Sequence, residues 1–600
     1  MIFLNLVIMI MTKFLYKIFY YKNFIIFALV LFFAFQSLYF ISLYKINFPY
    51  SVDHVGINYL YDYIIYEKFP YEKFFSSYAG HFTIFPRLIV LPNLIFNSFD
   101  IINLYYIPWI VLSLSLYLIY LLLKRTDIQL YWLLIPISAF VYSPLINSNY
   151  WAFAILQWLL PPLGIITVIF LLDKKINVKT FGTSILAALC STFSVIAGIV
   201  VWLPGIFSFM HYHTIENKWT DKKWLIGWLV SVSIVGLSYY YFVPKSEIEI
   251  NLSKFFSFEG LSFVTIFLST AFRLKYHFLM IIVGSITVIL SLFCVYYFTI
   301  LKKKIKIALP WLLFLLIGTT SAFVTALGRV HLDNHYGNEP YYIPMSQFIQ
   351  IGLIVLISLI ILDIRQQQFK YKRFSLFLLS SIIIMHMILL IPSYYSGWWR
   401  GNYYYEEKLE FVNCFSLTHG AECVTTHSHG TVGAFKSDLN FDLINYWLKN
   451  KMNIFGETNF NNIHRQELEK FSGLLNNKNN LDVGFGKIET INELQVNNND
   501  VVYLDNSFII INGWTLDSEM KQLDDIFLIV DDRPFLKYND FQPRLDIKDT
   551  FGKNTDINSG WSISFLSGYI EEGCHRLSVI GIKNGSKFTF DQELQICIKK

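Results

Sequence analysis

The sequence predicts an α-helical polytopic membrane protein with about 11 transmembrane helices and a C-terminal extracytoplasmic α+β region that ends in a β-sandwich-like domain. Three observations lead to this fold class. Hydrophobic residues make up 54% of the 600 residues and charged residues only 15%, against roughly 25% charged residues in an ordinary soluble domain. The apolar residues gather in long runs with basic clusters between them. After residue 392 the polar fraction rises, and no later run is long enough to cross a bilayer.

The charge pattern argues against nucleic-acid binding. The formal net charge is only +5, and the mean hydropathy is +0.46. Because the basic residues form short clusters between apolar runs, they indicate membrane topology rather than a polyanionic partner. The lipid bilayer is therefore the first partner that the sequence predicts.

The first predicted span is residues 23–44, which follow Lys13, Lys17 and Lys22. Basic residues before the first span favour a cytoplasmic N-terminus. The apolar residues 1–12 are too short to cross about 30 Å of hydrocarbon, and no small-residue cleavage site follows them, so we do not expect a removable signal peptide. A start at Met9 or Met11 stays open.

The run of residues 178–211 is longer than one span needs, and Ser191, Gly198 and Pro204 interrupt it, so we expect two short helices there. With that split, every basic cluster lies on the cytoplasmic side and the C-terminus lies outside, as the positive-inside rule requires. The remaining predicted spans are residues 103–123, 130–147, 151–172, 224–243, 277–301, 307–327, 343–363 and 374–392.

Three outer loops, residues 45–102, 244–276 and 328–342, should form one outer surface. Within the first two, residues 82–99 and 255–272 have a mixed character that favours interfacial amphipathic helices.

The predicted domains are the transmembrane domain (1–393), a mixed or helical connector (394–490) and a β-rich domain (491–600). The connector has helical spacing at 439–451 and an Asn-rich linker near 476–480 and 497–499. In the β-rich domain, Asn584-Gly585 indicates a type I′ hairpin. The predicted strands are residues 508–514, 526–530, 561–565, 576–582 and 588–596.

The cysteines divide between apolar and polar segments. Cys190 and Cys294 lie in apolar runs and are expected to be core residues. An oxidising compartment would permit disulfides between Cys414 and Cys423 and between Cys574 and Cys597, the second pair diagonal on one face of a hairpin. Cys414 and Cys423 with nearby His419, His427 and His429 leave a metal site as an alternative.

The first outer loop carries candidate catalytic residues. Asp53, beside His54, could serve as a general base for an incoming hydroxyl or hold a divalent cation. His81 could donate to a phosphate or a leaving group, and Arg87 could pair with one. Ordinary solvated or snorkelling side chains remain the alternative for each of these residues.

The third outer loop carries Arg329 at the end of a span, on the side opposite the basic clusters. A cation placed against the topological preference suits a lipid-linked phosphate, which a planar guanidinium binds at two points. An ion-paired or snorkelling arginine is the alternative. Tyr342 in this loop and His54 in the first are further candidate substrate-binding residues.

The layout resembles the large membrane glycosyltransferases of the GT-C class, which take a sugar from a polyprenyl-phosphate carrier at the outer face of the membrane. The resemblance covers about the first 400 residues. It rests on the acidic first loop with Asp53, the Gly-His…Phe-Pro-Arg stretch of residues 80–87, the split run near 193–204 and Ala-Leu-Gly-Arg at 326–329. The tail is similar to an accessory β-domain of bacterial proteins of this kind, through Asn512-Gly513-Trp514 and Ser559-Gly560-Trp561.

The resemblance implies an inverting glycosyltransferase of cell-envelope polysaccharide biosynthesis in the bacterial cytoplasmic (inner) membrane. Asp53 would be the catalytic base, with help from His81 at the leaving group, and Arg329 would hold the carrier phosphate. The donor would be a polyprenyl-phosphate-linked sugar and the acceptor a glycan or lipid. A paired Asp-x-Asp is absent, so a divalent cation (Mg²⁺ or Mn²⁺) stays open as a cofactor and metal ligands stay unassigned. A polymerase or ligase of lipid-linked glycans and a transporter or flippase of such lipids are the competing functions.

Overall fold

The structure is a computed structural model of the chain. It describes residues 22–47, 69, 71–78, 81–97, 100–146, 154–173, 176–216, 222–242, 251–332, 337–368, 371–418, 481–504, 508–539 and 541–598. The chain divides into two compact units. Unit 1 comprises Met1–Lys45, Phe69–Asn93 and Ile102–Tyr405, and unit 2 comprises Ile46–Lys68, Leu94–Ile101 and Glu406–Lys600.

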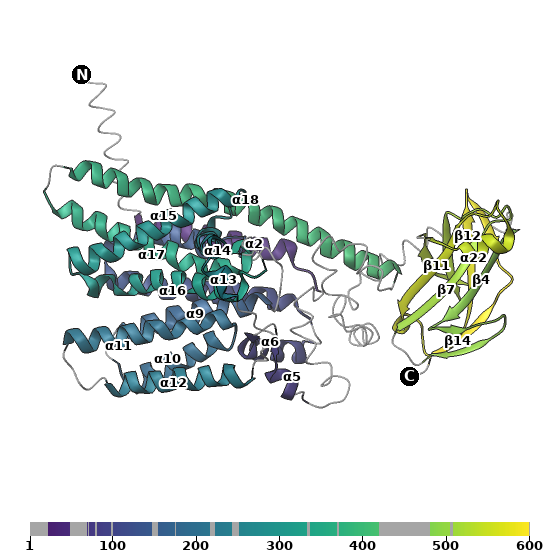
Figure 1. Cartoon of the computed structure of the whole chain (residues 1–600), viewed down its shortest axis with the longest axis horizontal. Helices are drawn as coiled ribbons and strands as arrows, with labels where there is room; N and C mark the ends of the chain where they lie inside the picture. Colours follow the sequence, from purple (N-terminus) through teal and green to yellow (C-terminus); the bar gives the residue numbers. More distant parts are fainter. Residues whose placement is uncertain are drawn as a thin grey trace, which may run out of the picture. The chain divides into compact units, whose positions relative to one another are not determined.

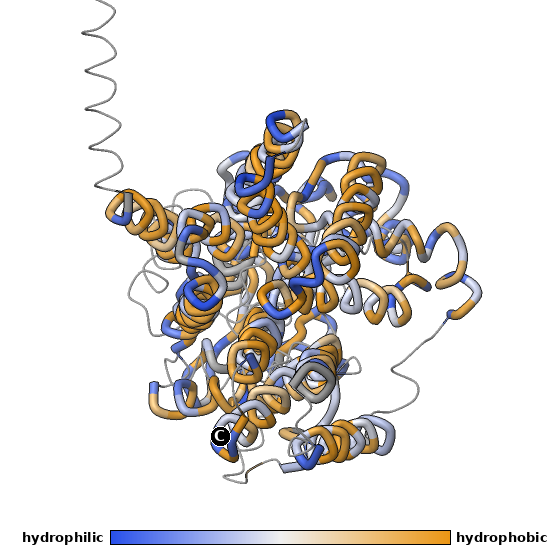
Figure 2. Tube along the Cα trace, turned by 90° about the vertical axis from the view of Figure 1, so that its left-hand side faces the viewer, coloured by the Kyte–Doolittle hydropathy of each residue, from blue (hydrophilic) through white to orange (hydrophobic). Residues whose placement is uncertain are grey.

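Unit 1 is a helical bundle whose long helices run side by side (Figure 1). Within the described residues, eight helices are long and apolar enough to cross a membrane. Figure 2 shows mostly hydrophobic residues along the helices, which fits a multi-pass membrane protein. The long helices are α2 (Lys22–Tyr44), α7 (Ile107–Thr126), α9 (Ala154–Leu172), α12 (Lys222–Phe242), α15 (His277–Tyr296), α16 (Ile305–Arg329), α17 (Ile343–Gln366) and α18 (Lys372–Thr418).

The structure confirms that the long run of residues 178–211 is broken into two helical parts. The chain turns after α10 (Val178–Thr192) and continues through the 3-10 helix η3 (Ile196–Val201) into α11 (Trp202–Glu216). At the turn, the Ser191 Oγ donates to the Gly198 carbonyl oxygen at 3.1 Å. A Cβ at position 198 would clash with the Ser191 carbonyl oxygen, so glycine is needed for this close approach.

The number of spans remains a prediction. Residues 130–147 were expected to span, but they form the 3-10 helix η2 (Ile128–Leu133) and the short helix α8 (Leu134–Val141). This segment and the two halves of the broken run make up the difference between the eight long helices and the predicted 11. Their α-helices α8, α10 and α11 are each shorter than 18 residues.

The interior of unit 1 is built around α17. In the most apolar stretch of this helix, 94% is buried inside the structure. It packs most extensively against α16. A hydrogen bond from Trp311 Nε1 to Thr126 Oγ1 at 2.9 Å joins α16 to α7. These contacts fix the level at which α16 ends, and therefore the position of Arg329.

Short elements connect the long helices at one end of the bundle: α5 (Tyr71–Phe75), β1 (Ser77–Tyr78), β2 (His81–Phe82), α6 (Ile84–Phe96), η1 (Ile102–Tyr106), α13 (Leu252–Phe255), α14 (Phe258–Ser269), η6 (Thr270–Phe272) and η9 (Pro340–Tyr342). A helix was expected within residues 82–99, and α6 lies there. The second expected interfacial helix differs, because α14 is buried from Ser262 to Ser269 and exposes no continuous face.

The last long helix, α18, continues through Pro392 to Thr418 rather than ending near residue 392. The rise in polarity after residue 392 marks a change in the chain's surroundings, and polar residues can continue a helix. The predicted helix at 439–451 and the Asn-rich stretch at 476–480 lie outside the described residues.

The β region of unit 2 contains two sheets that share one hydrophobic core (Figure 1). The first has the order β10-β11-β7-β4-β5; the second has the order β3-β13-β12-β14-β6, with β8 beside β12 and β9 beside β8. The elements are β3 (Leu481–Val483), β4 (Phe485–Ile491), β5 (Leu494–Gln495), β6 (Val501–Leu504), β7 (Phe508–Leu516), β8 (Asp525–Val530), β9 (Arg533–Tyr538), β10 (Gln542–Pro543), α22 (Leu545–Phe551), β11 (Asn558–Leu566), β12 (Gly573–Lys583), β13 (Ser586–Thr589) and β14 (Leu594–Ile598).

The predicted hairpin is confirmed: Lys583 pairs with Ser586, and Asn584 and Gly585 have φ angles of 49° and 79°. Three other expectations differ. Residues 588–596 form parts of two strands, the sheets begin at Leu481 rather than at residue 491, and residues 497–499 form a turn between β5 and β6 rather than a linker.

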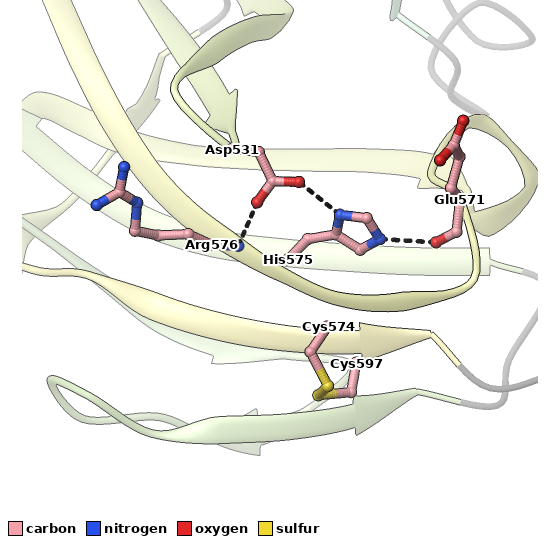
Figure 3. The surroundings of a disulfide bond; sticks show 6 residues. All are labelled: Asp531, Glu571, Cys574, His575, Arg576 and Cys597. Carbon is pink, nitrogen blue, oxygen red and sulfur yellow. Dashed lines mark hydrogen bonds and ion pairs between the residues drawn. A yellow bond between two sulfur atoms is a disulfide. The ribbon is translucent and has the colours of Figure 1, made fainter.

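A disulfide joins Cys574 and Cys597, which are direct partners across β12 and β14 rather than diagonal neighbours (Figure 3). Beside it, His575 Nδ1 lies 2.7 Å from Asp531 Oδ2, and its Nε2 lies 2.7 Å from the Glu571 carbonyl oxygen. Partial burial alone would lower the pKa of His575, but these two acceptors outweigh it and raise the pKa. Cys294 is buried and Cys190 half-buried, as expected for residues of apolar helices. Cys423 lies outside the described residues.

Candidate functional site

The first part of the site is the β1–β2 hairpin of the first outer loop. Phe82 anchors the hairpin in the bundle, with its ring 5.0 Å from that of Tyr239 and 6.0 Å from that of Phe193. His81, beside it, is only 8% exposed. The backbone N–H of Ile196 donates to His81 Nδ1 at 3.4 Å, so the loop is joined to the turn between α10 and α11. The split run therefore positions His81.

His81 is held in its neutral form. Burial, followed by the positive charge of Arg329, lowers the pKa of His81 to about 3. Because Nδ1 accepts a hydrogen bond, the proton of the neutral ring lies on Nε2. His81 can therefore donate one hydrogen bond from Nε2, but it does not supply a positive charge near pH 7.

Arg329 is the last residue of α16 and supplies the positive charge. It lies 24 residues after Ile305, about 36 Å along the helix, which exceeds a hydrocarbon core of roughly 30 Å. Arg329 is half-buried, and its charge acts on both His81 and Tyr341. Arg329 and His81, two candidates that are far apart in the sequence, therefore interact electrostatically in the structure.

An aromatic cluster lies against these two residues. The Trp158 ring is 6.0 Å from His81, 4.8 Å from Tyr341 and 5.7 Å from Tyr342. Tyr342 also lies 5.3 Å from Phe267 of α14. Tyr342, a candidate binding residue, is buried within this cluster. Trp158 and Tyr342 are buried, so this side of the site is poorly hydrated, and charge interactions are stronger in such surroundings.

Arg87 lies in α6 and is 4% exposed. Its Nη1 donates to the backbone carbonyl oxygens of Phe74 at 2.5 Å and Ser76 at 3.1 Å. These bonds hold the segment before the hairpin, so the contacts of Arg87 that the structure describes are structural.

Asp53 and His54, the candidate base and its neighbour, lie outside the described residues. The structure therefore leaves their distance to Arg329 as a prediction. Within the described ranges there is no group of three or more His, Cys, Asp or Glu side chains arranged to hold a metal ion.

Sequence reasoning missed Trp158, Arg273 and Arg400. The two arginines could have been found by the signal that marked Arg329, because the predicted topology places both on the side opposite the basic clusters. Trp158 lies inside an apolar run, where no sequence signal separates it from an ordinary core residue.

Comparison with protein-family models, with curated proteins and with solved structures gave no match. The function is therefore argued from the residues and their arrangement.

Proposed function

We propose that the protein is a membrane glycosyltransferase that moves a sugar from a polyprenyl-phosphate donor to a cell-envelope glycan or lipid at the outer face of a bacterial cytoplasmic membrane. The observation that best supports the proposal is that the charge of Arg329, at the end of α16, acts on a buried, neutral His81. A half-buried cation beside an aromatic cluster, past the length of a hydrocarbon core, suits the phosphate of a lipid carrier.

In the proposed reaction, Asp53 takes the proton from the acceptor hydroxyl as its oxygen attacks the anomeric carbon. The bond between that carbon and the phosphate oxygen breaks, and the electron pair leaves with the polyprenyl phosphate. Arg329 stabilises the negative charge of the leaving phosphate, and His81 Nε2–H can donate a hydrogen bond to it. A single displacement of this kind inverts the anomeric configuration.

The decisive experiment measures transfer by membrane vesicles that contain the full chain and receive a single-sugar polyprenyl-phosphate donor. We expect Asp53→Asn to lower transfer by at least about 100-fold, since a general base contributes roughly 10²–10⁴-fold. We expect a loss of about 100-fold or more for Arg329→Gln, as is found for one lost electrostatic donor.

The matched control is Arg365→Gln, which removes an arginine from the other end of the bundle, in the last turn of α17. It should insert and transfer normally. Normal transfer by Asp53→Asn would remove the proposed base, and normal transfer by Arg329→Gln would remove the proposed phosphate ligand. Addition of whole oligosaccharides without one-residue extension would favour the polymerase or ligase.

A further inference from the structure

Arg273 is held in an unusual place for an arginine. It follows η6 with φ 45° and ψ 57°, in the left-handed region that non-glycine residues rarely adopt. Its Nη1 is inaccessible to solvent and has no hydrogen-bond partner in the described chain. A buried guanidinium N–H without an acceptor is costly, so a specific ligand for this donor is the simplest explanation.

The charge of Arg400, on α18, acts on Arg273. Its Nη2 donates to the hydroxyl of Tyr404 at 2.9 Å, and its guanidinium lies 5.4 Å from the centre of that ring. Its Nε is inaccessible to solvent and, within the described residues, has no hydrogen-bond partner. Both arginines therefore keep a donor that no described protein atom accepts from.

The two arginines repel each other. Burial and the charge of Arg400 lower the pKa of Arg273 to about 10, although Glu339 and Tyr404 act in the opposite direction. With this pKa the Arg273 guanidinium remains charged at pH 7. The segment that carries Glu339 is joined to η6 by a hydrogen bond, in which Thr270 Oγ1 donates to the carbonyl oxygen of Gly337 at 2.7 Å.

Among the described groups that act on Arg273, Arg400 and Glu339 are the charged ones, so together with Arg273 they carry one net positive charge. Like charges placed together in a poorly hydrated environment are unfavourable unless an anion neutralises them. Guanidinium groups prefer the oxygens of phosphates and carboxylates, which they bind at two points. The charge and the free donors therefore both favour an anionic ligand.

The level of this group in unit 1 favours a lipid as the source of the anion. Arg400 lies 28 residues after Lys372, about 42 Å along α18, past a hydrocarbon core of roughly 30 Å. Exposed aromatic residues lie close to each arginine in the sequence: Trp399 is 58% exposed and Tyr276 is 60% exposed. Exposed Trp and Tyr residues are enriched at the level of the lipid headgroups.

We propose that Arg273 and Arg400 form a second anion site, which binds the phosphate of a lipid at the headgroup level on the same side as Arg329. This site goes beyond the proposed transfer reaction, because a lipid can bind to Arg273 and Arg400 whether or not the protein transfers a sugar. The phosphate can come from a membrane phospholipid or from a second lipid carrier such as a glycan acceptor.

The test uses the full chain in a neutral maltoside detergent, titrated with phosphatidylglycerol or with a short polyprenyl phosphate and followed by native mass spectrometry. The variants are Arg273→Gln and Arg400→Gln. The matched control is Arg373→Gln, at the other end of the same helix α18. We expect each site variant to weaken binding of at least one lipid by about 10-fold or more, as one lost charge-assisted contact does, and the control to bind normally.

The lipid whose binding is lost identifies the source. Loss for phosphatidylglycerol alone assigns a membrane phospholipid, and loss for polyprenyl phosphate assigns a carrier; either result supports the site. Binding of both lipids by Arg273→Gln and Arg400→Gln at the affinity of Arg373→Gln would overturn it. Arg329→Gln separates this inference from the proposed function, because only the latter requires that variant to lose polyprenyl phosphate.

Discussion

His81 and His575 are two histidines whose surroundings shift the pKa in opposite directions. His575 offers both ring nitrogens to acceptors, and its pKa is raised. His81 accepts a hydrogen bond at Nδ1 in a buried place beside a cation, and its pKa is lowered to about 3. The protonation state is therefore set by the partners of the ring, which the sequence does not reveal.

The low pKa of His81 makes unit 1 sensitive to acid. In the unfolded chain His81 has a pKa of about 6.5 and binds a proton below that pH, whereas in the folded chain its pKa is about 3. Unfolding is therefore favoured by up to about 1.4 kcal/mol for each pH unit across that window. We expect the melting temperature of unit 1 to fall between pH 6.5 and pH 5.

The matched variant is His81→Asn, whose side-chain oxygen can accept from Ile196 as Nδ1 does but does not titrate. Its melting temperature should depend less on pH than that of the unmodified chain, measured by scanning fluorimetry in detergent. Equal pH dependence of the two proteins would show that His81 is not the group that titrates.

At the residue scale, the roles of the candidate site residues stay predictions. Arg329 and His81 were chosen by residue type and topology, and in the structure the charge of Arg329 acts on His81. Arg87 was chosen by the same reasoning, yet its described bonds go to backbone carbonyls. The difference arises from the tertiary structure. Segments that are distant in the sequence decide which acceptors surround a guanidinium, and the neighbouring residues in the sequence do not reveal them.

Among the elements, the turn between α10 and α11 gives the sharpest test. A methyl group at Gly198 would meet the Ser191 carbonyl oxygen, and backbone cannot move aside cheaply. We expect Gly198→Ala to destabilise unit 1 by about 1–3 kcal/mol, as overpacking does, measured as a lower melting temperature.

Gly182→Ala in α10 is the matched control, since nothing lies within 4 Å of a Cβ there. In a helix interior this change should stabilise by up to about 1 kcal/mol. A Gly198→Ala protein as stable as Gly182→Ala would mean that the turn is not closely packed.

Element types were easier to predict than element ends. Glycine and serine inside a long apolar run predicted the break after Thr192, and Asn-Gly predicted the β12–β13 hairpin. The two- or three-residue strands were missed because they carry too few residues to show an alternating pattern. Strand β3, for example, pairs with the distant β13, Leu481 lying opposite Lys587.

For the whole molecule, the predicted topology can be tested directly. With the N-terminus inside and the C-terminus outside, an alkaline phosphatase fused after residue 600 should be active, and one fused after Lys303 should be inactive. The phosphatase folds only in an oxidising compartment. The reverse pattern would place Arg329 and Arg400 in the cytoplasm and remove the proposed outer site.

The disulfide of unit 2 is a second test of the same topology. It closes a separation of 23 residues, for which loop entropy gives about 3 kcal/mol of stability. We expect Cys574→Ser with Cys597→Ser to lower the free energy of unfolding of unit 2 by about that amount. Thiol labelling of the unreduced protein at these two positions would show instead that the bond does not form in the cell.

The sequence predicted the broad class of the whole molecule from composition and charge alone. An apolar N-terminal part and a polar C-terminal part follow directly from where the hydrophobic runs stop. The number of spans could not be fixed in this way, because a short apolar helix such as α8 can be one part of a broken span, enter the bilayer partway or pack inside a bundle.

The burial of α17 has a consequence for how the protein is made. Six of the seven other long helices leave the ribosome before it, yet it provides the surface against which several of them pack. The earlier helices pack against one another, as α7 does against α9 and α14 against α15, but they lack the surface that α17 provides until it is inserted. Chains truncated before residue 343 should consequently be short-lived substrates for membrane proteases, even though each helix they contain could enter the bilayer unaided.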